Sequence, residues 1–86
     1  MTPPESERPT IPVVWDRRQR RPVSFFWRHR RYRVERVLRT WVIQTGWWDE
    51  RLRTDRRYFR VRADGRLFDL CFDRRARRWS LERSLG

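Results

Sequence analysis

The 86-residue chain contains no lysine, one cysteine and one histidine. A single cysteine, Cys71, excludes an internal disulfide, and His29 with Cys71 cannot supply the ligands of a structural zinc site. The three glycines are isolated from one another, so no glycine-rich phosphate loop is present. We expect Cys71 to be an inert, partly buried thiol and His29 a solvated turn residue. These shortages predict no enzyme, no metal site, no cofactor and no small-molecule substrate.

Long hydrophobic segments are also missing. The longest uncharged run, residues 40–48, has nine residues, and about 20 are needed to cross a bilayer. The first residues lack the basic and apolar regions of a secretory signal. These features predict a cytoplasmic protein that does not contact a membrane.

What the chain has in excess is positive charge. Its 23 basic residues, all arginine, outnumber 11 acidic ones, which gives a formal net charge of +12. Codon usage in a G- and C-rich genome explains arginine in place of lysine, but it does not explain the surplus. The surplus predicts an anionic partner, and the phosphate backbone of a nucleic acid is the commonest one.

The prolines divide the chain into two parts. All five lie within the first 22 residues, and proline cannot donate the hydrogen bond that a central strand needs. This distribution predicts an extended, flexible arm over residues 1–22 and one folded domain over residues 23–86, since the length allows a single small core.

The first part of the domain alternates apolar and polar residues, which predicts strands over 23–28 and 31–42. With His29 and Arg30 as the turn, Trp27 lies opposite Tyr32. The apolar phase slips after residue 35, which indicates a β-bulge near Glu35 and Arg36. A short helix over 34–41 is the alternative, and the β-branched residues there favour the strand.

An Asp64-Gly65 pair between alternating segments predicts a two-residue hairpin turn joining strands 57–63 and 66–73. A further strand over 78–84 follows a loop at 74–77. The expected partners are Val61 with Phe68, Phe59 with Leu70, Arg60 with Asp69, Phe72 with Trp79, Leu70 with Leu81, and Asp69 with Glu82.

Five antiparallel strands without a long helix predict an all-β fold, a small SH3-like barrel with an extended N-terminal arm. An OB-like barrel is the alternative.

Arginines crowd two of the expected turns. Arg28 and Arg31 lie opposite each other in the expected register, and like charges across a ladder are unfavourable unless an external anion binds them. Aromatic side chains beside arginines are typical of single-stranded nucleic acid binders, although adjacent tryptophans could instead plug the open end of a barrel. The candidate nucleic-acid-binding residues are Arg28, Arg30, Arg31, Arg33, Arg74, Arg75, Arg77, Trp47, Trp48 and Tyr58.

Several segments together resemble a known family. They are 31–34 (RYRV), Trp47-Trp48, 58–61 (YFRV), the Asp64-Gly65 hairpin and 78–81 (RWSL). The chain resembles a small bacterial domain of unknown function that occurs alone and at the C-terminus of ImuB-type, inactive Y-family DNA polymerase homologues. The resemblance implies a connection to DNA repair and translesion synthesis, and it supplies no active-site residues.

The sequence therefore predicts a non-catalytic nucleic-acid-binding accessory module. Its expected partners are DNA, with single strands favoured, or RNA, and in addition translesion polymerase components. The alternative is a protein-interaction adaptor that docks an acidic or proline-rich segment of a polymerase-complex partner.

Overall fold

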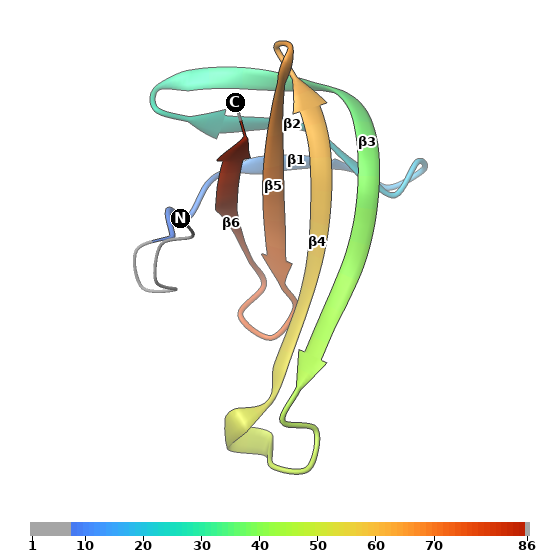
Figure 1. Ribbon diagram of the computed structural model, residues 1–86, viewed down its shortest axis with the longest axis vertical. Helices are drawn as coiled ribbons and strands as arrows, with labels where there is room; N and C mark the ends of the chain where they lie inside the picture. The colour runs from blue at the N-terminus through green and yellow to red at the C-terminus, as the bar shows by residue number, and fades with distance from the viewer. Residues whose placement is uncertain (1–7, 86) are drawn as a thin grey trace.

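The computed structural model describes residues 8–85, which form one antiparallel sheet of six strands curled into a half-barrel (Figure 1). The strands follow one another in sequence order across the sheet, so every connection is a hairpin or a short loop. The elements are β1 (Val13–Asp16), β2 (Arg21–Trp27), β3 (Arg30–Thr45), β4 (Thr54–Ala63), β5 (Arg66–Asp73) and β6 (Arg78–Leu85), with a 3-10 turn, η2 (Glu50–Leu52), between β3 and β4. The all-β class is confirmed, and the strand number differs from the expected five.

The additional strand comes from the segment that we expected to be part of the arm. β1 pairs with β2, with Val13 opposite Phe25. Its prolines do not prevent this, because Pro9 and Pro12 precede the strand and β1 has a neighbour on one side only. Residues 1–7 of the expected arm lie outside the described residues.

The residues that lead into β1 also hydrogen-bond to the opposite edge of the sheet. The Ile11 amide donates to the Trp79 carbonyl at 3.1 Å, and the Leu81 amide donates to the Pro9 carbonyl at 3.0 Å. The Ile11 side chain is buried in the core. Residues 9–11 therefore tie the last strand to the first and hold the sheet in its curled form.

The register of β4, β5 and β6 confirms the expected pairs with one exception. Asp64 and Gly65 have φ angles of 54° and 68°, as a tight hairpin turn requires. Asp69 lies opposite Arg83 rather than Glu82, because a bulge interrupts the β5–β6 ladder between Asp69 and Leu70.

The expected β2–β3 register is wrong by two residues. The turn consists of Arg28 and His29, both with positive φ, so Phe25 lies opposite Tyr32 and Arg31 lies opposite Phe26. A shift of two preserves the face on which each side chain lies. The observed register stacks the Phe25 and Tyr32 rings, with centroids 5.2 Å apart at an interplanar angle of 12°, which favours it over the expected one.

β3 is a bent strand throughout, and no helix forms over 34–41. Register shifts occur between Val34 and Arg36 and again between Val37 and Arg39, which confirms the expected bulge. The bends allow the first part of β3 to pair with β2 and the longer second part with β4. As a result, the second part of β3 and β4 project as a hairpin below the body of the molecule (Figure 1).

The core fills the inner face of the curled sheet. Phe25, Val61, Phe68 and Leu70 are fully buried there. The Phe68 ring contacts those of Phe25 and Tyr32 at centroid distances of 5.1 Å and 5.0 Å. This aromatic cluster joins β2, the first part of β3 and β5.

Candidate nucleic-acid interface

The candidate arginines fall into two separate groups. Arg28, Arg30, Arg31 and Arg33 lie on or beside the β2–β3 turn near the upper end of the molecule, whereas Arg74, Arg75 and Arg77 lie in the β5–β6 turn in its lower half (Figure 1). The seven arginines therefore do not form one surface.

In the upper group, two arginines are held by neighbours within the protein. Arg30 forms an ion pair with Asp64 of the β4–β5 turn, and the Arg28 guanidinium carbon lies 4.4 Å from the centre of the Trp27 ring. Arg31 and Arg33 are exposed, and among residues 8–85 neither has an acidic partner. These two are the members free to bind an external anion.

In the lower group, Arg75 links two segments of the protein through hydrogen bonds. Its guanidinium donates to the backbone carbonyls of Glu50 and Arg53 at 2.7 Å and 3.0 Å, so it joins the β5–β6 turn to the segment between β3 and β4. Arg74 lies 3.7 Å from the Asp55 carboxylate. Arg77 is exposed and forms no ion pair within the described part of the chain. The positive charge of the β5–β6 turn is thus partly neutralised. Through Arg75, the same turn holds the segment between β3 and β4 in place.

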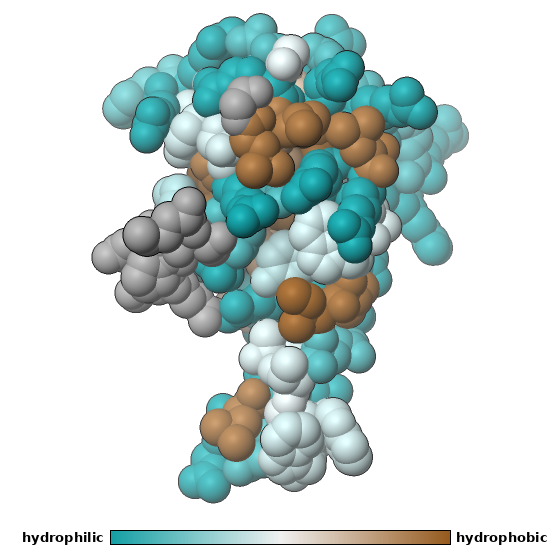
Figure 2. All heavy atoms as spheres, viewed as in Figure 1, coloured by the Kyte–Doolittle hydropathy of each residue, from teal (hydrophilic) through white to brown (hydrophobic). Residues whose placement is uncertain are grey.

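That loop, residues 46–53, which we call the hairpin end, carries the two adjacent tryptophans. Trp47 is 79% and Trp48 69% exposed, with ring centroids 5.9 Å apart in an edge-to-face arrangement. Figure 2 shows the hairpin end as a narrow projection with hydrophobic and weakly polar residues among hydrophilic ones. The alternative that these tryptophans plug the barrel is wrong, and both rings are accessible to a partner.

Tyr58 is not accessible, and its expected role as a stacking surface is wrong. It lies on the outer face as expected but is only 6% exposed. The Trp41 ring covers it, with centroids 5.2 Å apart and planes at 5°. Burial, followed by the proximity of Cys71 and Glu82, raises the pKa of the Tyr58 hydroxyl. The outer position was correct, but the sequence did not reveal the aromatic neighbour.

The sequence reasoning missed a cavity on the inner face. It measures about 390 Å³ and is lined by Trp15, Arg57, Phe59, Phe72, Arg74 and Trp79; we call it the aromatic cavity. Arg57 shares the face of Phe59 and Val61, because the three alternate along β4. An arginine in phase with core residues marks the point at which the core ends, and this signal could have been read from the sequence.

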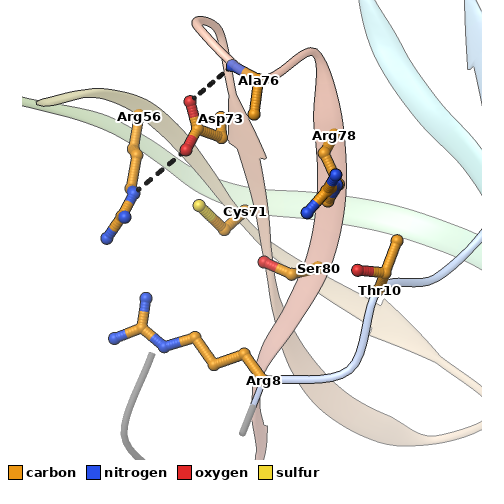
Figure 3. Close-up of a pocket in the computed structure, with 8 residues that line it drawn as sticks. All are labelled: Arg8, Thr10, Arg56, Cys71, Asp73, Ala76, Arg78 and Ser80. Atoms are coloured by element: carbon orange, nitrogen blue, oxygen red, sulfur yellow. Dashed lines mark hydrogen bonds and ion pairs between the residues drawn. The ribbon is translucent and has the colours of Figure 1, made fainter. Parts of the chain in front are cut away.

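A smaller cavity of about 120 Å³ lies on the outer face (Figure 3). The Cys71 thiol lies at its inner side, with Ser80, Thr10 and three arginines around it. Cys71 is 2% exposed, more deeply buried than expected, and this burial raises the pKa of its thiol. The protonated thiol is a poor nucleophile. Within residues 8–85, no three histidine, cysteine or carboxylate residues come together as a metal site.

Two acidic residues of the sheet, Asp69 and Glu82, are each paired with an arginine. Arg60 binds Asp69 with both guanidinium contacts, at 2.8 Å and 3.0 Å, which confirms the expected ladder pair. Glu82, which we expected beside Asp69, instead pairs with Arg8 at 2.7 Å. Each of these two carboxylates is therefore paired with an arginine of its own.

The family described as a domain of unknown function (DUF6504) matches residues 7–85. No curated protein and no solved structure matches the chain. The span of the match includes β1 as well as the five later strands. Across residues 8–85, no helix has the length and the apolar character needed to cross a membrane.

Proposed function

The chain belongs to the DUF6504 family, a domain of unknown function, and we propose that it is a non-catalytic accessory module that binds nucleic acid, with single strands preferred. The observation that carries this proposal is the exposure of Trp47 and Trp48 at the end of a projecting hairpin. Exposed indoles are unfavourable in water, and in a strongly basic protein they suit a ligand that is both aromatic and anionic.

The bases would stack on the two indoles, with about 1–3 kcal/mol for each base. The edge-to-face arrangement of the rings presents two differently oriented aromatic surfaces, which suits the unstacked bases of a flexible single strand better than the paired bases of a duplex. The indoles therefore account for the preference for single strands over a duplex, and the arginines account for the dependence of the affinity on salt concentration.

Phosphate contacts would come from arginines near the hairpin end. Arg53 and Arg77 are exposed, and among the described residues they form no ion pair through their side chains. Arg31 and Arg33 offer a second basic patch at the other end of the sheet. If about four to six phosphates are neutralised, the logarithm of the binding constant falls against the logarithm of salt concentration with a slope of roughly −3 to −5.

The test is a fluorescence anisotropy titration of labelled single-stranded DNA, duplex DNA and RNA oligonucleotides at several salt concentrations. Trp47→Ala with Trp48→Ala should weaken single-strand binding and leave the salt slope unchanged. Arg53→Ala with Arg77→Ala should weaken binding and flatten the slope. The matched control is Phe26→Ala, which removes an exposed aromatic ring, 46% accessible, from another part of the surface. Absence of binding at low salt, or binding that does not respond to salt, would contradict the proposal.

We place this activity in DNA repair and translesion synthesis, in support of a polymerase complex, through the resemblance of the strand segments to the domain appended to ImuB-type polymerase homologues. Binding that is tighter to a primer–template junction than to a fully paired duplex would support this placement. Equal binding to both would argue against it.

A protein-interaction adaptor is the second candidate, and the apolar character of the hairpin end favours it. Leu52 is 60% exposed beside the two tryptophans, and Ile43 is 41% exposed on the adjoining strand. Capture of a polymerase component that persists after nuclease treatment and is lost with Leu52→Ser would support the adaptor. Capture that nuclease abolishes would support nucleic acid binding.

A further inference from the structure

We propose that the aromatic cavity receives one unpaired nucleobase, an inference that rests on the proposed function and adds a second contact point for the same strand. The cavity lies on the inner face of the sheet, whereas Trp47 and Trp48 lie in the loop between β3 and β4, at the end of the hairpin that projects from the body of the molecule (Figure 1). A strand that crosses from the hairpin end into the half-barrel would contact both.

The cavity is lined by aromatic rings that the protein leaves partly uncovered. Trp79 contacts Phe72, Phe59 and Trp15, with ring centroids 5.0 Å, 5.5 Å and 6.0 Å apart. Trp15, Phe72 and Trp79 remain half-buried rather than fully enclosed. The volume of about 390 Å³ falls within the range of about 300–1,000 Å³ for sites that bind small organic molecules. The lining thus offers ring faces to a planar ligand of nucleobase size.

The positive charges at the aromatic cavity favour an aromatic ligand that is linked to phosphates. Arg57 is exposed and, among the described residues, forms no ion pair. Arg74 lines the same cavity and shares its charge with Asp55. Two guanidinium groups beside aromatic rings suit a base whose sugar is linked to phosphates, and they are less suited to an uncharged apolar side chain of a protein.

A second hollow shows where the phosphates on one side of the base would run. It is lined by Arg20, Thr40, Trp41 and Val42 and shares Arg57 and Phe59 with the aromatic cavity. The two hollows meet at Arg57 and Phe59, and the guanidinium groups that line them are those of Arg74, Arg57 and Arg20. A series of guanidinium groups beside an aromatic cavity suits the phosphates of a strand whose base occupies that cavity.

The position of the cavity also accounts for strand selectivity. It lies within the curl of the sheet, so a base that remains paired in a duplex cannot enter. A base in a duplex would first have to leave its stack, which costs a few kcal/mol. A single strand has no such cost, and this preference is independent of the two exposed tryptophans.

The experiment uses the Trp47→Ala, Trp48→Ala variant of the full chain, in which the hairpin end no longer contributes stacking. Binding of a ten-nucleotide oligothymidylate is compared with binding of an abasic oligomer that has the same number of phosphates. We expect the oligothymidylate to bind about tenfold more tightly, as stacking of one or two bases implies. We also expect it, and not the abasic oligomer, to quench the remaining tryptophan fluorescence.

Arg57→Ala and Arg62→Ala, each added to that variant, form a matched pair of exposed arginines on β4. Arg57→Ala should weaken oligothymidylate binding several-fold, and Arg62→Ala, which lies outside the cavity, should change it less. Equal affinity for the two oligomers, or complete loss of binding in the double tryptophan variant, would overturn base insertion and leave the proposed function standing. Failure of the unsubstituted protein to bind either oligomer would overturn the proposed function itself.

Discussion

The two turn glycines provide a sharp test of how the hairpin end is built. Gly46 and Gly65 have nearly the same backbone conformation, with φ angles of 65° and 68°. A Cβ atom at Gly46 would lie 2.2 Å from the Leu52 carbonyl oxygen, whereas a Cβ at Gly65 would meet no atom within 4 Å. Alanine at either site thus incurs the same backbone strain, and only Gly46→Ala adds a collision with the main chain.

The expected magnitudes follow from these two terms. The left-handed conformation costs an alanine about 1–2 kcal/mol, and the smaller entropy of the unfolded chain offsets part of it. Gly65→Ala should therefore lower the free energy of unfolding by about 1 kcal/mol. The contact at Gly46 forces the backbone of residues 46–52 apart and adds about 1–3 kcal/mol. Gly46→Ala should therefore have two to four times the effect of Gly65→Ala.

Urea denaturation, followed by circular dichroism, measures both differences, and thermal melts should show a decrease of about 4–8 °C for Gly65→Ala. Gly46→Ala should also change the fluorescence of the adjacent tryptophans and weaken nucleic acid binding, because it displaces Trp47 and Trp48. Equal destabilisation by the two substitutions would refute the close approach of Gly46 to Leu52. Unchanged tryptophan fluorescence in Gly46→Ala would refute its role in positioning the indoles.

Three further outcomes are expected. Phe68→Ala removes a fully buried ring and should lower the free energy of unfolding in urea by about 3–5 kcal/mol, whereas Leu38→Ala, at a 42% exposed position, should change it little. Ile11→Ala should cost about 2–5 kcal/mol in the same assay, and an unchanged midpoint would show that residues 9–11 do not hold the sheet closed. Burial raises the pKa of both Cys71 and Tyr58, so as the pH rises these groups lose their protons in the unfolded chain before they do in the folded protein. The free energy of unfolding should therefore decline as the pH rises above about 9. Cys71→Ala should reduce the first part of that decline.

The part of the fold that the sequence predicted best is the part where turn chemistry and alternation agree. Asp64-Gly65 determined the β4–β5 register, and the pairing of Phe72 with Trp79 followed from it. The β2–β3 register could not be obtained in the same way, because Arg28 and His29 do not form one of the residue pairs, such as Asn-Gly or Asp-Gly, that mark a two-residue hairpin turn in a sequence. The stacking of Phe25 on Tyr32, a tertiary contact, decides that register.

The sequence identified some of the residues of the candidate site, but it did not predict where all of their side chains lie. The adjacency of Trp47 and Trp48 in a loop identified them as candidates, but it left open whether they are exposed or plug the barrel, and the structure shows both to be exposed. The covering of Tyr58 by Trp41 depends on the β3 bulges, whose positions shift the cross-strand partner. The aromatic cavity depends on how far the sheet curls, which alternation along single strands does not reveal.

The bulges in β3 have a consequence for the behaviour of the protein in concentrated solution. Beyond Arg33, β3 pairs with β4 on one side only within the described residues, so its other side is an edge without a strand partner. Such an edge invites strand addition by a second molecule and the growth of aggregates. The irregular spacing at Val34–Arg36 and Val37–Arg39, together with the charge of Arg36 and Arg39, opposes this addition.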